Sequence, residues 1–352
     1  MATYDDILGQ GDVWQSVLDQ LEAVPTDTLS ADRPWLYTGC GASFHMATVA
    51  AELARSRGAD AVAAPASEGW INPGHWLREG GVVVGLSRTG TTTETVQCLR
   101  VGGELGLTTV GVSLDPSSPV VTNVQIGCGL ADLRESARVM TRSASALLLA
   151  AQWLWANAAQ DEGLRSGLEA LPDQVVTRMA DVDAAARSLA ASTASNIVFL
   201  GSGTAYGIAR QAALQLQETS GLPVSAYHPL EYRHGPMAGL DSNTIVVLIS
   251  TSSASGFDEV LAKDVALLGG TFALCGDTRE LEGFSGAGTV VPTSNGVTPL
   301  LSPTASLPFL QLFAYHQTVA VGETNESVRN LDRTVDPHVN PHTLPPGLVR
   351  VR

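Results

Sequence analysis

Short apolar runs that end in glycine or hydroxyl residues alternate along the chain with longer, Ala-rich segments of helical periodicity. The runs predict strands at 33–39, 60–66, 81–87 and 108–114, and again at 196–203, 223–229, 244–250 and 271–276. Strands that are apolar at nearly every position and alternate with helices are typical of parallel sheets with both faces covered. The pattern therefore predicts an α/β protein.

The pattern occurs twice. Gly39 and Gly41 match Gly201 and Gly203 at a separation of 162 positions, and a second hydroxyl-rich motif matches at 163. Two motifs in the same order and at nearly one offset predict two tandem three-layer α/β/α units. We expect an N-terminal helix at 1–30, a first unit at 31–160, a linker helix at 161–192, a second unit at 193–335 and a Pro-rich tail at 336–352.

Composition narrows the possible partners and location. The formal net charge is −15, and no basic run is available to neutralise nucleic acid. The first ten residues lack the basic start and apolar core of a signal peptide, and Gln152 and Asn157 interrupt the longest apolar stretch, so we expect neither secretion nor a membrane span. These features predict a cytoplasmic protein with a small-molecule substrate.

Cofactor chemistry has little support in the sequence. The four cysteines lie far apart with no Cys-x-x-Cys pair, which disfavours both a disulfide framework and a zinc site. Lys263 is the only lysine available for a Schiff base, and it lies in a helical stretch where we expect it to be solvated. Gly39-Cys40-Gly41 lacks the third glycine of a dinucleotide fingerprint, because Phe44 stands there. We expect no metal and no cofactor.

The segment 86–96, LSRTGTTTETV, is the strongest local motif. An apolar strand ends in five hydroxyl residues around Gly90 before a helix begins. Hydroxyls and the free N–H groups at a helix start can surround a phosphate. Capping by one or two hydroxyls would be a purely structural explanation, but a single cap needs only one. We predict an anion site here, and the second copy lacks a counterpart of Gly90, so only one unit is expected to keep it.

Three further features carry titratable side chains. The segment 227–241 places His234 before Gly-Pro, beside an acid and an arginine, which is compatible with proton transfer or with a structural histidine. Glu135 precedes a helix, where it is expected to act as a cap. Glu218 lies in the last turn of a helix before Gly221, where the helix dipole disfavours a negative charge and would raise the pKa of the carboxyl.

Together these motifs resemble the sugar isomerase (SIS) domain family, in particular its two-domain phosphosugar branch. That branch includes the isomerase half of glutamine–fructose-6-phosphate aminotransferase. The segments that carry the resemblance are GCGAS, LSRTGTTTET, ALQLQETS, EYRHGPMAGLD and the stretch from 310 to 335. The resemblance covers the chain from about residue 35 to 335.

The resemblance implies a role for each matching residue. Glu218 falls on the family's general base, and His234 on the histidine linked to ring opening, which in the family reaches the site from a second subunit. A homodimer is therefore implied. The implied sugar-binding and phosphate-binding residues are Cys40, Gly41, Ser43, Ser87, Arg88, Thr89, Thr92, Arg138 and Arg333.

Some positions depart from the aminotransferase pattern. Gln215 replaces a lysine, Arg88 replaces a glutamine in the phosphate loop, and Arg333 replaces a lysine of the tail. No glutaminase half is present, so we do not expect the synthase reaction. The resemblance implies a metal-independent amino-sugar-phosphate deaminase or isomerase. The alternatives are a fructosamine-6-phosphate deglycase and a non-catalytic phosphosugar-binding regulator.

Overall fold

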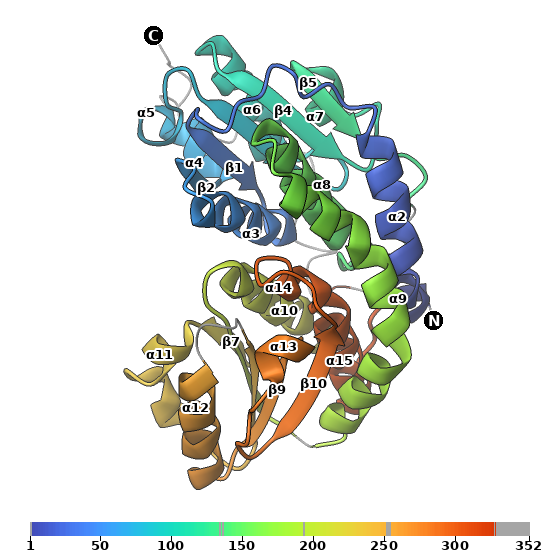
Figure 1. The fold of residues 1–352 in the computed structure, drawn as a ribbon, viewed down its shortest axis with the longest axis vertical. Coiled ribbons are helices and arrows are strands. Elements are labelled where there is room, and N and C mark those ends of the chain that lie inside the picture. Colours follow the sequence, from blue (N-terminus) through green and yellow to red (C-terminus); the bar gives the residue numbers. More distant parts are fainter. Residues whose placement is uncertain are drawn as a thin grey trace.

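The first unit is built on a parallel sheet whose strand order is β2-β1-β3-β4-β5 (Figure 1). The computed structural model describes residues 2–326 except 134, 136, 193 and 251–254, and also residue 328. The strands are β1 Trp35–Gly39, β2 Ala61–Pro65, β3 Val82–Leu86, β4 Thr108–Ser113 and β5 Ile126–Gly129. The helices are α3 Ala42–Ser56, α4 Ala66–Ile71, α5 Pro73–Trp76, α6 Thr93–Glu104, α7 Pro119–Thr122 and α8 Arg142–Ala158.

The second unit repeats this topology in the order β7-β6-β8-β9-β10, again with all strands parallel. Its strands are β6 Asn196–Leu200, β7 Val224–Tyr227, β8 Thr244–Ile249, β9 Thr271–Asp277 and β10 Thr289–Ser294. Its helices are α10 Thr204–Ser220, α11 Pro229–Tyr232, the 3₁₀ turn η1 Pro236–Gly239, α12 Ser255–Leu267, α13 Thr278–Leu281, α14 Ser302–Ala305 and α15 Leu307–Ala320. The expected pair of α/β units with parallel sheets is confirmed.

The last strand of each sheet was not predicted. β5 is only four residues long and two of them are glycines, whereas β10 contains Pro292. Both features are disfavoured inside a sheet, but they are tolerated at an edge, which is where both strands lie. The edge position is set by packing and gives no strong local signal.

Helices outside the repeats join the two units. The N-terminal region forms two helices, α1 Ala2–Leu8 and α2 Gln10–Leu21, and not the single helix expected. The long helix α9, Glu162–Ala190, begins at the capping residue Asp161, whose side chain accepts the N–H of Leu164. α9 contacts α2 and α8 as well as α15 and β10, and it runs along the side of both units (Figure 1). Among the described helices, none combines the length and apolarity needed to cross a bilayer.

Each sheet separates two apolar layers, and the inner layers of both sheets merge into one core. Alternate residues of β3 show this: Val82 and Val84 face the shared core, whereas Val83 packs under α6. In the second unit Val247 faces the shared core and Val246 packs under α12. The shared core is filled by α3, α8, α9, α10 and α15. The two units are therefore fused by burial, not merely tethered.

The helices α3 and α10 pack directly against each other and set the relation between the units. A Cβ atom at Gly207 would lie 2.5 Å from Val49 Cγ2 and 3.1 Å from the carbonyl oxygen of His45. At the other end of the pair, a Cβ atom at Gly41 would lie 4.0 Å from Leu214 Cδ2. Residues early in α3 thus meet residues late in α10, so the pair is antiparallel. The C-terminal end of α10 consequently lies against the first unit.

We predict that Gly207→Ala destabilises the protein. The added methyl group has no room against Val49, and overpacking of this kind costs about 1–3 kcal/mol, which exceeds the gain of up to ~1 kcal/mol from the better helix propensity of alanine. Gly103→Ala in α6 is the matched control, because its Cβ would meet only Thr109 Cγ2, at 3.7 Å. Urea unfolding should show a loss for Gly207→Ala and no loss for the control. Equal stability of the two variants would contradict the described packing.

Candidate active site

The hydroxyl-rich loop between β3 and α6 is held together by its own side chains. Ser87 Oγ lies 2.9 Å from Thr92 Oγ1 and accepts the N–H of Gly90 at 3.0 Å. The N–H of Ser87 donates to the carbonyl oxygen of Val112 at 3.1 Å, which continues the sheet pairing with β4. Ser87 is buried, whereas Thr89 is exposed. The loop is therefore fixed at Ser87 and open to solvent at Thr89.

Gly90 is required by the shape of this loop. Its φ is +65°, and a Cβ atom there would lie 1.9 Å from Ser118 Oγ. The carbonyl oxygen of Gly90 accepts the N–H of Val120 at 3.1 Å, and that of Arg88 accepts the N–H of Leu114 at 3.2 Å. The loop is thus seated on the segment that follows β4, and no side chain fits between them.

Thr92 occupies the N-cap position of α6 but makes no side-chain capping bond. Its hydroxyl engages Ser87 instead. Capping by Thr92 therefore does not account for the motif. The N-terminus of a twelve-residue helix and several hydroxyls converge on one loop, and this combination suits an anion.

The Gly39–Ser43 turn lies beside this loop, because β1 and β3 are adjacent parallel strands. Gly41 adopts φ 54° and ψ −123°, and its repeat partner Gly203 adopts φ 57° and ψ −129°. Ser43 is buried, and its N–H donates to the carbonyl oxygen of Cys40 at 3.1 Å. Burial raises the pKa of the Cys40 thiol to about 11. The thiol is therefore uncharged at neutral pH and is not a nucleophile.

Glu218 reaches this region from the second unit, in the last turn of α10. The helix ends at Gly221, whose φ is +67°, as its sequence indicates. Burial of the carboxyl raises the pKa of Glu218 from 4.5 to about 7, and the positive charge of Arg88 opposes the rise. The direction agrees with the expectation from the helix end, but burial is the main cause. A carboxyl with this pKa can accept and return a proton near neutrality.

Arg88 has a second acidic neighbour, Glu135. Arg88 Nη1 lies 3.3 Å from Glu135 Oε2 and donates to the carbonyl oxygen of Arg138 at 2.8 Å. The predicted capping role of Glu135 is confirmed, because its Oε1 accepts the N–H of Thr141 at 2.6 Å at the start of α8. The ion pair with Arg88 was not predicted. The two residues are 47 positions apart, and no spacing rule connects them.

Of the two remaining predicted binding residues, the structure describes one. The side chain of Arg138 is exposed beside the loop, next to the segment that holds Arg88. Arg333 and the tail at 336–352 lie outside the described residues, so their predicted roles stay predictions.

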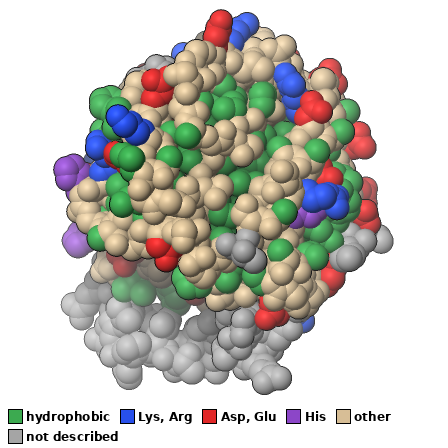
Figure 2. Space-filling model, turned by 90° about the horizontal axis from the view of Figure 1, so that it is seen from below, with side chains coloured by type: hydrophobic (Ala, Val, Ile, Leu, Met, Phe, Trp, Pro, Cys, Tyr) green, Lys and Arg blue, Asp and Glu red, His purple; other side chains and the backbone are tan. Residues whose placement is uncertain are grey.

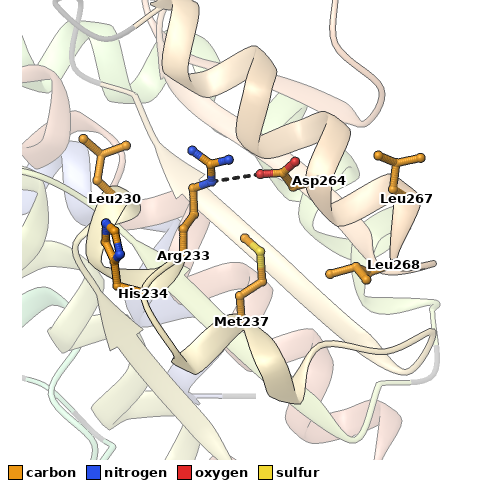
Figure 3. Close-up of a pocket in the computed structure, with 7 residues that line it drawn as sticks. All are labelled: Leu230, Arg233, His234, Met237, Asp264, Leu267 and Leu268. Carbon is orange, nitrogen blue, oxygen red and sulfur yellow. Dashed lines mark ion pairs between the residues drawn. The ribbon is translucent and has the colours of Figure 1, made fainter.

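His234 lies elsewhere within the same chain. It is exposed and lines an open pocket of about 590 Å³ between η1, α11 and α12 (Figure 3). Arg233 Nε lies 2.9 Å from Asp264 Oδ2 on α12 and forms one wall of this pocket. Glu218 is not among the residues that line this pocket.

The matching loop of the second unit has a different character. Ser250, the repeat partner of Ser87, donates its hydroxyl to Asp258 Oδ2 at 2.9 Å. Burial raises the pKa of Asp258 to about 6. A carboxyl at this place repels an anion once it is ionised, so the two matching loops differ in charge; that only one unit keeps an anion site stays a prediction. Residues 251–254 of this loop lie outside the described part of the chain.

Comparison with known proteins finds a family match within the second unit. Residues 192–261, from just before β6 into α12, match the model of the SIS domain. Two curated relatives are the isomerizing glutamine–fructose-6-phosphate aminotransferases of Caulobacter vibrioides and Escherichia coli K12. Each is 28% identical to this chain over 74% of its length, and the match covers 45% and 44% of the relatives respectively. The chain therefore spans about half the length of the curated relatives it matches.

Solved structures with the same fold cover nearly the whole chain. The C-terminal domain of glucosamine-fructose-6-phosphate aminotransferase from Francisella tularensis has a TM-score of 0.77 at 19% identity, covering 93% of this chain and 98% of that chain. Glucosamine-6-phosphate deaminase from Thermotoga maritima has a TM-score of 0.76 at 22% identity, covering 94% and 98%. Tagatose-6-phosphate ketose/aldose isomerase from Escherichia coli has a TM-score of 0.79 at 19% identity, covering 93% and 95%.

The SIS domain match falls in the second unit, and the first unit repeats its strand order and its glycine turn. The resemblance to the SIS domain family that the motifs indicate is thereby confirmed.

Proposed function

We propose that this protein interconverts ketose and aldose sugar phosphates by proton transfer, as an amino-sugar-phosphate deaminase or isomerase. The observation that carries the proposal is the Glu218 carboxyl. Its pKa is raised to about 7, and it lies close enough to the hydroxyl loop to feel the charge of Arg88. The proposal therefore takes this carboxyl of the second unit and the hydroxyl loop of the first unit as parts of one site.

The phosphate of the substrate would occupy the loop of Ser87, Thr89 and Thr92. The Ser87 and Thr92 hydroxyls lie 2.9 Å apart, so one phosphate group can reach both. The start of α6 and the guanidinium of Arg88 add positive potential at the same place. A local site of this kind can bind a dianion although the whole chain carries a net charge of −15.

The Glu218 carboxylate would remove a proton from the carbon next to the carbonyl or imine carbon of the open-chain sugar. The electron pair of the broken C–H bond forms the carbon–carbon double bond of an enediol or enolamine, while the π pair of the C=O or C=N bond moves to its oxygen or nitrogen, which takes up a proton. When the carbon is protonated again, the hydroxyl or amino group on the other carbon gives up a proton as the new C=O or C=N bond forms. Return of the proton to the neighbouring carbon completes the shift between aldose and ketose. With an amino sugar, water then hydrolyses the imine, releasing ammonia and the ketose phosphate. The step uses side-chain acid–base chemistry alone.

His234 would act across a homodimer. Its pocket opens on the outer side of the second unit, where exposed apolar side chains lie on α11, on α12 and just beyond α12: Leu230, Phe257, Val260, Leu267 and Leu268. Figure 2 looks onto the lower end of the molecule and shows apolar side chains across the middle of that face, with most of the charged ones toward its edge. Such a surface favours a protein partner. We propose that a second copy covers it, which would let His234 reach the partner's sugar and assist ring opening.

The reaction is tested with the purified protein and a panel of fructose, glucosamine and tagatose 6-phosphates. Aldose–ketose conversion is followed by NMR, and ammonia release by a coupled assay. Conversion of a member of the panel supports the proposal, and ammonia from the amino sugar identifies a deaminase. Binding without any product would favour a regulatory phosphosugar-binding protein instead.

We predict that Glu218→Gln lowers kcat by about 10²–10⁴-fold while KM changes little, because the amide cannot accept the proton. Glu169→Gln on the exposed side of α9 is the matched control and should retain full activity. Steady-state kinetics with the panel substrate measures both. A Glu218→Gln variant with the activity of the control would rule out the assigned base.

We predict an acid limb at about pH 7 in the pH profile of kcat/KM, since Glu218 must be ionised to accept a proton. A limb near 4.5, the ordinary value for this carboxyl, would contradict the burial.

Stability gives an independent check with a defined sign. The folded state holds the Glu218 proton more tightly than the unfolded state, so this group costs stability as the pH rises from about 4.5 to 7 and above. Glu218→Gln should therefore be more stable than wild type above pH 7, with the difference fading below pH 4.5. Urea unfolding at both ends of this range measures it.

A further inference from the structure

The Arg88 guanidinium is hydrogen-bonded through Nη1, and part of its side chain is exposed to solvent. Three hydrogen bonds share its Nη1 atom, to Glu135 Oε2 at 3.3 Å, to the carbonyl oxygen of Ala137 at 3.3 Å and to that of Arg138 at 2.8 Å. A guanidinium carries five N–H donors. The side chain of Arg88 is 30% exposed, whereas that of Glu135 is 2% exposed. One end of the guanidinium is therefore anchored on a buried carboxylate, and donors remain for a ligand.

The carboxylate that anchors Arg88 is itself held rigidly at the start of α8. Glu135 Oε1 accepts the N–H of Thr141 at 2.6 Å, the hydroxyl of Thr141 at 2.8 Å and the N–H of Ser143 at 3.3 Å. The hydroxyl of Ser143 donates to Oε2. These donors hold the carboxylate in one orientation.

The start of α8 is held in turn by buried glutamines from other parts of the chain. Gln311 of α15 donates from Nε2 to the carbonyl oxygen of Thr141 at 3.1 Å. Gln10 of α2 donates to Gln311 Oε1 at 2.7 Å. Both glutamines are at most 1% exposed. The anchor of Arg88 is thus set by the packed core and cannot follow the loop if the loop moves.

The same guanidinium acts in two directions. The backbone of Arg88 lies in the hydroxyl loop between Ser87 and Thr89. The positive charge of its guanidinium lowers the pKa of Glu218, against the effect of burial. A displaced guanidinium would weaken both effects together, because each depends on where the charge lies.

We propose that Glu135 is a positioning residue for the reaction, which pins Arg88 Nη1 so that the cation keeps a fixed place beside the anion loop. The proposal rests on the proposed function in taking the loop to be the phosphate site. Glu135 does not touch the substrate in this account, and it acts only through Arg88.

A purely structural role predicts something different. If Glu135 only caps α8, its loss weakens the fold and affects ligand binding equally with or without Arg88. If it acts through Arg88, its effect on ligand binding disappears once Arg88 has been removed. A double-mutant cycle separates the two.

The cycle compares wild type, Arg88→Gln, Glu135→Gln and the double variant, each as the full chain. Inorganic sulfate is the probe, because it stays a dianion across the pH range, and calorimetry gives its affinity. The amide introduced by Glu135→Gln keeps one acceptor for the N–H groups of α8 but loses the charge that anchors Arg88. We expect each single variant to bind sulfate about tenfold more weakly, and the double variant no more weakly than Arg88→Gln.

The pH profile supplies a second readout. Arg88→Gln should move the acid limb of kcat/KM above pH 7, because the charge that opposes the raised pKa of Glu218 is gone. Asp161→Ala is the control for a lost helix-terminal carboxylate, since Asp161 caps α9 and pairs with Arg57, neither of which belongs to the hydroxyl loop. It should lower the free energy of unfolding by ~1 kcal/mol and leave sulfate affinity unchanged.

Each result decides one question. Equal weakening by Glu135→Gln in both backgrounds, or none in either, overturns the positioning role while turnover by wild type leaves the proposed function intact. Failure of wild type both to bind sulfate and to convert any sugar phosphate of the panel would instead overturn the proposed function. Loss of sulfate affinity in Asp161→Ala would show that stability alone controls binding, which would also overturn the positioning role.

Discussion

The close antiparallel packing of α3 on α10 is the constraint on which the rest of the structure depends. At Gly207 the backbone of α10 approaches Val49 so closely that no side chain fits between them. This contact turns the C-terminal end of α10 toward the first unit. A residue of one unit is thereby delivered to the loops of the other, and the site is a product of the pairing and not of either unit alone.

The two units share one topology, but their matching loops carry different side chains. The two units share strand order, and Gly41 and Gly203 share one unusual backbone conformation. Yet the first unit offers hydroxyls where the second offers the buried Asp258 bonded to Ser250. Two opposing influences set the pKa of Glu218: burial raises it, and the positive charge of Arg88 lowers it. The pKa of about 7 results from both influences.

Much of the fold could be predicted because it depends on local patterns. Eight of the strands, the tandem repeat and the capping role of Glu135 follow from hydrophobic runs, glycine turns and helix-start chemistry. The edge strands β5 and β10 could not be predicted, since their sequences are glycine-rich or contain proline and only tertiary position makes them strands. The ion pair between Arg88 and Glu135 also left no signal, because it depends on how two distant loops meet. Glu218 could be singled out by its unusual place in a helix, but the main cause of its raised pKa is burial, which appears only after folding.

The central claim is that Glu218 moves a proton on a carbon of a sugar phosphate held by the first unit. Deuterium incorporation tests it most directly: the protein is incubated with fructose 6-phosphate or glucosamine 6-phosphate in D₂O, and the C1 and C2 positions are followed by NMR. The account predicts that wild-type protein introduces solvent deuterium at one of these carbons and that Glu218→Gln does not. Exchange by the variant at the wild-type rate, or no exchange by wild-type protein that binds these sugars, would contradict it.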